Sequence, residues 1–148
     1  MTATPASTLV VDDAAQRRRV DRLELAAIAA GGALGALARV ALSRTFTATP
    51  GHWPWVTFAI NILGAFLLGY IVTRLQERLP LSTLRRPLLG TGFCGAFTTF
   101  STIQIELLQM IDHERYSLAL GYVLANVSCG YLAIFLASAL VRRVRVIR

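Results

Sequence analysis

The residues of this chain whose types suit chemistry are polar groups set within otherwise apolar stretches. They are Asn61, the hydroxyl-rich run from Thr98 to Thr102, Glu106 and Asn126. Polar side chains are costly in lipid, so at bilayer depth they either line a pathway or hold helices together by hydrogen bonds. Each of them alone is compatible with both roles. Taken together, beside a glycine-rich stretch, they favour a polar pathway.

The chemistry of these groups suits a small anion better than a cation. Amides and hydroxyls can donate hydrogen bonds, and the positive edge of an aromatic ring allows Phe100 to face an anion. Apart from Glu106, no carboxylate lies deep in the apolar runs, so the sequence offers no ring of carboxylates for a cation. From the residues alone, the interpretation stops at a polar pathway.

Other function classes find little support in the sequence. It has no GxSxG, HExxH or P-loop motif, and its two histidines fall in predicted loops, so we do not expect an enzyme. Cys94 and Cys129 lie in apolar segments without a CxxC motif and are expected to be packing residues. The net charge of +7 permits nucleic-acid binding, but the arginines flank apolar runs, where topology signals lie. We therefore expect no nucleic-acid partner.

The elements that must position the polar groups are four predicted transmembrane helices. Of the 148 residues, 55% are hydrophobic and 16% are charged, against about 25% charged residues in a soluble domain. Residues 1–22 are polar, carry no evident cleavable signal peptide and are predicted to form a disordered tail. The apolar runs place a four-span domain at residues 23–148, with spans at about 23–43, 56–75, 87–111 and 116–141.

Two of these spans have unusual features. In the first, Gly31 and Gly35 are small residues at a spacing that lets another helix approach closely. In the third, the glycines of the Gly90–Gly95 stretch precede the Thr98–Thr102 run, and this composition weakens a continuous helix. A break in mid-membrane would leave backbone groups that protein, water or an ion must satisfy. The sequence thus predicts an all-α membrane protein whose third helix is broken.

Arginine counting predicts the orientation of the spans. With four spans, both termini and the second loop lie on the same side of the membrane. Twelve of the 15 arginines belong to that side and three to the other, and basic residues favour the cytoplasmic side. Both termini are therefore predicted to be cytoplasmic. The three exceptions are Arg39, Arg44 and Arg115.

Three motifs resemble the Fluc fluoride channels, also called CrcB proteins. They are GGALGALAR (31–39), FAINILGAFLLGY (58–70) and GTGFCGAFTTFSTIQIE (90–106), and the resemblance extends over roughly residues 31–140. It implies antiparallel dimers of four-span subunits in the cell membrane, with two fluoride pores along the interface. It also implies that passive export of cytoplasmic fluoride lowers fluoride toxicity.

The resemblance assigns roles to individual residues. A structural sodium ion at the dimer centre would be held by backbone carbonyls, here those of Gly95 and Thr98. Asn61 would donate to fluoride, and Phe100 would line the pore by its ring edge. The remaining expected pore residues are Ser101 and Thr102 in a polar track, Glu106 near the end of that track, Tyr122, Ile103 and Asn126.

Two positions depart from the family pattern. Ile103 stands where the family has a second pore phenylalanine, so the pore on this side is expected to be altered or inactive. Asn126 stands where the family has serine, and it can still donate a hydrogen bond. The arginine bias also disfavours insertion of one sequence in both orientations. We therefore hypothesise a heterodimer with an oppositely oriented homologue rather than a homodimer.

Two alternatives belong to different classes. A coupled four-span exporter of drugs or other small solutes would need a membrane-buried carboxylate early in the chain, but after Glu24 the first span has none. A structural membrane protein without transport is the other alternative. Fluoride flux that does not depend on pH would separate a channel from a proton-coupled exporter, and any flux in liposomes would exclude the structural role.

Overall fold

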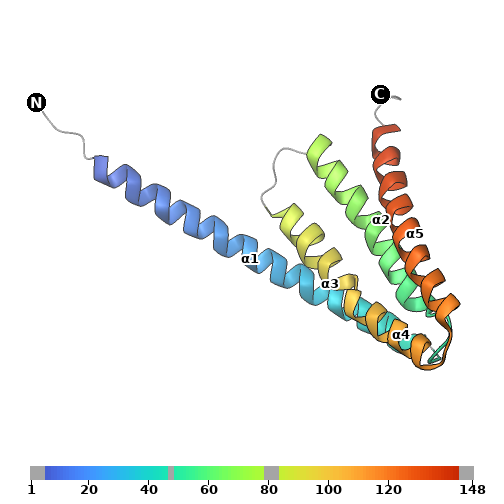
Figure 1. The fold of residues 1–148 in the computed structure, drawn as a ribbon. Helices are drawn as coiled ribbons and strands as arrows, with labels where there is room; N and C mark the ends of the chain where they lie inside the picture. The colour runs from blue at the N-terminus through green and yellow to red at the C-terminus, as the bar shows by residue number, and fades with distance from the viewer. Residues whose placement is uncertain (1–5, 47–48, 79–83, 144–148) are drawn as a thin grey trace, which may run out of the picture.

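The fold is a set of helices, seen in a computed structural model that describes residues 6–46, 49–78 and 84–143 (Figure 1). Side chains are described for 22–46, 49–75 and 84–143. The elements are α1 (Ala6–Thr45), α2 (Trp55–Arg78), the π-helix η1 (Arg86–Cys94), α3 (Gly95–Phe97), α4 (Phe100–Asp112) and α5 (Tyr116–Arg143). No strand occurs in the described part of the chain, so the predicted all-α class is confirmed.

Three of the helices are long and apolar enough to cross a membrane. The corresponding stretches of α1, α2 and α5 are Arg22–Thr45, Trp55–Leu75 and Tyr116–Arg143. Many of their apolar side chains point outward, such as Leu37, which is 67% exposed, and Phe135, which is 59% exposed. Outward-facing leucine and phenylalanine over whole helices are typical of a surface covered by lipid or by another subunit. The remaining predicted span, at about 87–111, corresponds to the consecutive short helices η1, α3 and α4.

The N-terminal segment differs from the sequence-based expectation. Residues 1–22 were predicted to be a disordered tail, but α1 begins at Ala6, so the backbone of residues 6–22 is helical. Alanine, leucine, arginine and glutamate favour helix, and no glycine or proline interrupts the chain between Ala6 and Ala30. A helix fixed in the apolar stretch can therefore propagate outward without a new nucleation step. Residues 1–5 of the predicted tail lie outside the described residues.

The helices form two packed pairs. Along its apolar part α1 lies against η1 and α3, and α2 lies against α5 (Figure 1). A Cβ atom added to Gly31 would lie 2.0 Å from the carbonyl oxygen of Leu88, and one added to Gly35 would lie 2.2 Å from that of Phe93. The predicted close approach at Gly31 and Gly35 is confirmed, because only glycine leaves room for the backbone of η1.

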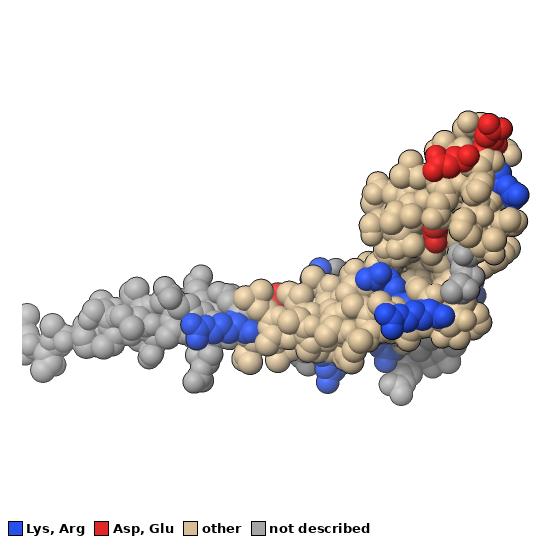
Figure 2. All heavy atoms as spheres, turned by 90° about the horizontal axis from the view of Figure 1, so that it is seen from below, with Lys and Arg blue, Asp and Glu red and all other residues tan. Residues whose placement is uncertain are grey.

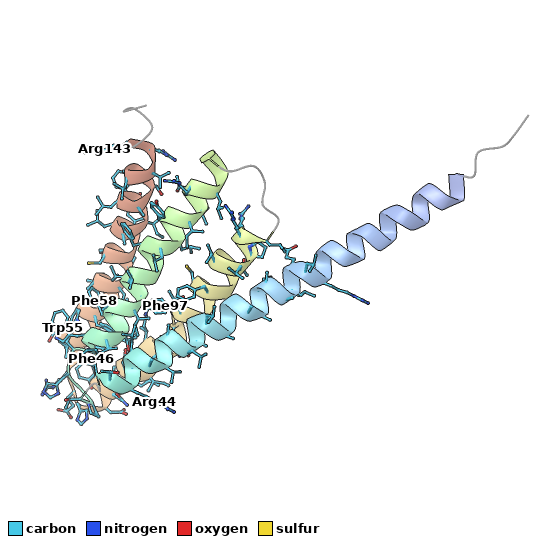
Figure 3. All side chains as sticks on the ribbon, turned by 180° about the vertical axis from the view of Figure 1, so that it is seen from behind. Arg44, Phe46, Trp55, Phe58, Phe97 and Arg143 are labelled. Carbon is cyan, nitrogen blue, oxygen red and sulfur yellow. The ribbon has the colours of Figure 1, made fainter. Side chains whose placement is uncertain are left out.

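The two ends of the bundle differ in composition. Arg44 and Trp55 lie at the end where α1 passes to α2, and Arg143 lies at the opposite end (Figure 3). The ring centroid of Trp53 lies 5.6 Å from that of Trp55, and tryptophan pairs at a helix start suit a membrane–water interface. In Figure 2 the acidic side chains gather mainly at one end, away from the N-terminal part of α1, whereas basic side chains are spread along the molecule.

Candidate functional site

Two extended residues, Thr98 and Thr99, separate α3 from α4. Thr98 has φ −77° and ψ 156°, and Thr99 has φ −144° and ψ 121°. The N–H and hydroxyl groups of Thr98 both donate to the carbonyl of Cys94, at 3.1 and 3.0 Å. The hydroxyl of Thr99 accepts from the N–H of Thr102 at 3.2 Å and caps the start of α4. Threonine side chains compete with helical backbone bonds in this way, which is the local reason for the interruption.

Asn61 in α2 holds this interruption from the side. Its Nδ2 donates to the carbonyl of Thr99 at 3.1 Å, and its Oδ1 accepts from the N–H of Thr99 at 2.8 Å. The side-chain amide thus pairs with both backbone groups of one residue, as a neighbouring strand would. One turn further along α2, Gly64 lets the chain approach, since an added Cβ there would lie 2.2 Å from Cγ2 of Thr98. Asn61 still has one Nδ2 hydrogen for a ligand.

A short series of hydroxyl groups begins at Thr99 and continues along α4. The Thr99 hydroxyl lies 2.8 Å from the Thr102 hydroxyl and 3.3 Å from that of Ser101. Ser101 is exposed and Thr102 is half-buried. The predicted track of Ser101 and Thr102 is therefore connected in the structure to Thr99, a member of the Thr98–Thr102 run to which the resemblance assigned no role.

Glu106 forms the centre of a second polar cluster. Its Oε1 accepts from the hydroxyl of Thr57 at 2.5 Å, and its Oε2 accepts from the hydroxyl of Tyr122 at 2.8 Å. Glu106 and both of its partners are buried. A buried carboxylate with a donor on each oxygen is well satisfied. The donors come from α2 and α5, so this cluster also ties α4 to both of these helices.

Thr57 is a site residue that sequence reasoning missed. It lies four residues before Asn61 and seven before Gly64, so all three share one face of α2. That spacing was the available signal for a polar face directed at the third span. Arg39 in α1 was also missed, because it was counted only for topology. Its Nε donates to the carbonyl of Ala96 at 3.0 Å, where a cation suits the carboxyl end of α3.

A groove beside the interruption brings six predicted site residues together. It has a volume of about 880 Å³ and is lined by residues of α2, η1, α3, α4 and α5. The side chain of Phe100 there is 73% exposed. The six residues are Asn61, Gly95, Thr98, Phe100, Ile103 and Asn126.

Not every predicted residue lines this groove. Ser101, Thr102, Glu106 and Tyr122 belong to the hydroxyl series and the carboxylate cluster instead. The Nδ2 of Asn126 donates to the carbonyl of Tyr122 at 2.8 Å, and its buried Oδ1 has no partner in the described part of the chain. The second Nδ2 hydrogen of Asn126 is left for a ligand, so the expected donor role stays a prediction.

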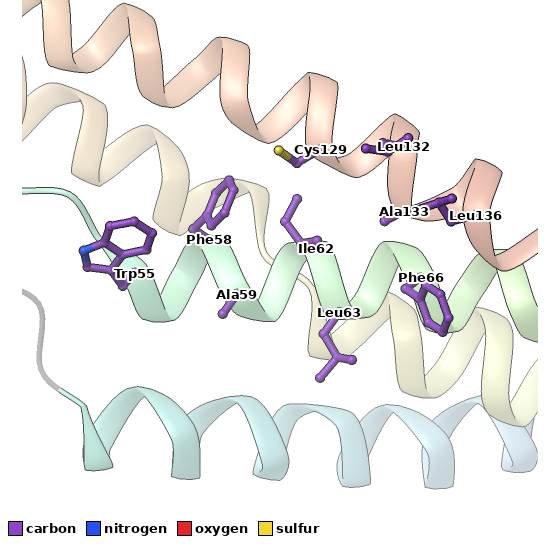
Figure 4. Close-up of a pocket in the computed structure, with 10 residues that line it drawn as sticks. All are labelled: Trp55, Phe58, Ala59, Ile62, Leu63, Phe66, Cys129, Leu132, Ala133 and Leu136. Carbon is purple, nitrogen blue, oxygen red and sulfur yellow. The ribbon is translucent and has the colours of Figure 1, made fainter.

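A second groove, between α2 and α5, is chemically different (Figure 4). It has a volume of about 640 Å³ and is lined by apolar side chains, among them Trp55, Phe66 and Leu136. Cys129 also lies there, in the packing role expected from the sequence. With almost no polar surface this groove cannot replace the hydration shell of an ion, whereas the groove beside Thr98 and Thr99 offers amide, hydroxyl and carbonyl groups.

The possible ligands for a cation in this site are backbone carbonyls. No cluster of three or more histidine, cysteine, aspartate or glutamate side chains occurs in the described part of the chain. Gly95 and Thr98 are among the residues that line the groove, where the chain turns from helical to extended. Carbonyl oxygens are hard ligands suited to an alkali cation, so the residues present fit the sodium ion implied by the resemblance.

Comparison with known proteins gives consistent matches over most of the chain. The family described as CrcB-like protein, Camphor Resistance (CrcB), matches residues 26–138. "Fluoride-specific ion channel FluC 1" of Mycolicibacterium paratuberculosis is 61% identical over 128 residues, covering 86% of this chain and 97% of that protein. The protein of the same name from Mycobacterium bovis is 59% identical over the same shares. "Fluoride-specific ion channel FluC" of Saccharophagus degradans is 38% identical over 117 residues, covering 79% and 88%.

Proposed function

Since this chain belongs to the CrcB family, we propose that it is a subunit of a fluoride channel, in which fluoride leaves the cytoplasm passively. Hydrogen fluoride enters cells as a neutral acid and dissociates inside, so a selective exit for the anion lowers fluoride toxicity. A membrane potential that is negative inside assists export by about 2.3 kcal/mol per charge per 100 mV. No coupling to protons or nucleotide is needed. The chain is a multi-pass membrane protein, and we place it in the cell membrane.

The observation that carries this proposal is the groove in which Asn61 and Phe100 lie beside the interrupted third helix. In the proposed path, fluoride accepts from the remaining Nδ2 hydrogen of Asn61 and contacts the ring edge of Phe100. The hydroxyls of Ser101 and Thr102 continue the path toward Glu106. Both oxygens of Glu106 already accept hydrogen bonds, so this carboxylate is not arranged as an open cation ligand.

The third span of the proposed channel consists of η1, α3 and α4, with its break in mid-membrane. This gives four spans with α1, α2 and α5, and an even number places both termini on one side. The ends of α2 and α5 and the start of η1 lie at the same end of the molecule (Figure 1). Arg85, Arg86, Arg142 and Arg143 belong to that end, and the positive-inside rule makes it cytoplasmic.

A second subunit completes the pore in this proposal. The groove at the interruption is open on one side, and its exposed Phe100 has no cover within the described part of the chain. The bias of twelve arginines against three supports an oppositely oriented homologue as the partner. Ile103 agrees with such a division, because it packs against the apolar cluster of Met110, Ala119 and Tyr122 rather than offering a ring edge.

A structural sodium ion at the centre of the dimer belongs to the same proposal. The carbonyls of Gly95 and Thr98 would hold it, together with the equivalent groups of the second subunit. The bound cation would supply positive charge that fixes the interrupted backbone. Fixed in this way, the interrupted backbone would orient the hydrogen-bond donors of this chain toward fluoride.

Fluoride efflux from liposomes tests the function. The chain is reconstituted alone and together with its nearest paralogue, and fluoride release is followed with an electrode. We expect flux with the pair that does not depend on pH. Flux that requires a proton gradient would favour a coupled exporter, and the absence of flux with both chains would contradict the channel function. A stable, conducting antiparallel dimer of this chain alone would contradict the heterodimer.

A further inference from the structure

We propose that Asn61 and Thr99 are positioning residues for the sodium ion. Each side chain binds a backbone N–H that would otherwise donate to one of the two carbonyl groups with which this chain holds the ion. The inference deepens the proposed function and rests on it. It assigns a role to Thr99, a residue of the Thr98–Thr102 run to which the resemblance gives none. The two carbonyls concerned are those of Gly95 and Thr98.

Asn61 binds the backbone N–H that would otherwise donate to the carbonyl of Gly95. In a continuous α-helix the N–H of residue 99 would donate to the carbonyl of residue 95. Here the N–H of Thr99 donates to Oδ1 of Asn61 at 2.8 Å instead. The second bond, from Nδ2 of Asn61 to the carbonyl of Thr99 at 3.1 Å, fixes the direction of the amide. The side chain of α2 therefore takes the donor that would otherwise occupy the Gly95 carbonyl.

The side chain of Thr99 binds the backbone N–H that would otherwise donate to the carbonyl of Thr98. In a continuous helix the N–H of residue 102 would donate to it. Here the N–H of Thr102 donates to Oγ1 of Thr99 at 3.2 Å, which is the N-cap bond of α4. The extended conformation of Thr98, with ψ 156°, also turns its carbonyl away from the axis of the preceding helix. Two different side chains thus free two carbonyls that lie three residues apart.

The neighbouring carbonyl of Ala96 provides an internal contrast. In a continuous helix the N–H of residue 100 would donate to it, whereas here Nε of Arg39 donates to it at 3.0 Å. The carbonyl of Cys94 is satisfied by the N–H and hydroxyl of Thr98. The carbonyls on either side of Gly95 therefore have donors, and that of Thr99 has one in Nδ2 of Asn61. The helical donors for the carbonyls of Gly95 and Thr98 are engaged elsewhere. An unpaired backbone carbonyl inside a membrane protein is costly, and a cation between the two would satisfy both.

Variants of Thr99 with and without the side-chain hydroxyl test this role. The full chain and the partner with which it assembles are purified either in sodium or in choline salts, and thermal unfolding is measured. We expect the wild type and Thr99→Ser, which keeps the hydroxyl, to unfold at a lower temperature without sodium. Thr99→Val removes Oγ1, which binds the N–H of Thr102 and caps α4. The extended backbone at Thr98 and Thr99 is then no longer favoured over a continuous helix, in which the Thr102 N–H bonds the Thr98 carbonyl, and most of the sodium-dependent shift is lost. Asn61→Leu is expected to behave in the same way. A full sodium-dependent shift in Thr99→Val and Asn61→Leu would overturn the proposal.

Carbonyl NMR of the wild-type protein keeps the proposal falsifiable if these variants fail to assemble. With 13C-labelled carbonyls, exchange of sodium for choline is expected to move the resonances of Gly95 and Thr98. The resonance of Ala96, whose carbonyl is bonded to Arg39, is expected to stay. Unchanged Gly95 and Thr98 resonances, or an equal movement of Ala96, would overturn the inference. If fluoride flux is present but sodium changes neither the unfolding temperature nor the carbonyl resonances, this inference is contradicted and the channel function stands. If sodium has both effects but no fluoride flux is found, the channel function is contradicted and the role of Asn61 and Thr99 at the sodium site stands.

Discussion

The hydroxyl of Tyr122 in α5 donates to Oε2 of Glu106 in α4 at 2.8 Å, although the two residues lie on different helices of the bundle. The Tyr122 ring meanwhile packs edge-on against Trp53, with ring centroids 5.3 Å apart. The Tyr122 side chain thus joins α5 to α4 and to the segment just before α2. The polar and apolar parts of this contact can be separated by mutation.

Tyr122→Phe is expected to destabilise the protein and reduce fluoride flux. The phenylalanine ring retains the packing on Trp53, but Oε2 of the buried Glu106 loses its donor, at a cost of about 1–3 kcal/mol. Thermal unfolding and liposome efflux measure the two effects. Tyr131→Phe is the matched control, because Tyr131 is 74% exposed. Equal behaviour of the two variants would show that the bond to Glu106 contributes nothing.

Gly35→Ala is expected to reduce stability by separating α1 from η1. The new Cβ would lie 2.2 Å from the backbone oxygen of Phe93, and a rigid backbone cannot yield as a side chain can. Overpacking of this kind typically costs about 1–3 kcal/mol. Gly32→Ala, on the same helix, is the control, since its Cβ would have its nearest neighbour at 3.9 Å. Thermal unfolding in detergent should distinguish them, and an unaffected Gly35→Ala protein would argue against this helix contact.

Gly64→Ala is expected to disturb the interruption itself. Its Cβ would lie 2.2 Å from Cγ2 of Thr98, whose side chain is held by its bond to the Cys94 carbonyl. Thr98 must then shift, so both fluoride flux and the sodium-dependent stabilisation should decrease. In Gly121→Ala, by comparison, the added Cβ would meet nothing within 4 Å. Normal flux and normal sodium dependence in Gly64→Ala would contradict the role given to this close approach.

Phe100→Leu is expected to lower fluoride flux by about tenfold or more. The leucine side chain keeps the apolar character but lacks the positive ring edge, and a loss of about 1.4 kcal/mol at the barrier lowers a rate tenfold. Phe135→Leu makes the same change at another exposed phenylalanine, which is 59% exposed and does not line the groove. Liposome efflux compares the two, and an unchanged rate in Phe100→Leu would remove Phe100 from the path.

The sequence by itself determined the class of the molecule and the region of its site. Long apolar runs with few charges predict helices in lipid, and the polar residues within them stand out because lipid cannot satisfy them. Gly31 and Gly35 predicted a close helix contact because glycine at this spacing has few other uses in an apolar helix. The extent of α1 was not predicted, because the polar composition of residues 6–22 conceals good helix formers.

Only the tertiary structure decided which hydrogen-bond donor pairs with which acceptor. The pairs Asn61–Thr99 and Thr57–Glu106 are 38 and 49 residues apart in the chain. Which residues pair depends on the rotation of α2 about its axis and on its shift along that axis relative to the third span. No local sequence pattern fixes these two quantities. The same applies to Arg39, whose bond to Ala96 follows from the packing of α1 on η1 and α3. Composition shows that polar groups at bilayer depth need partners, but helix packing in three dimensions selects them.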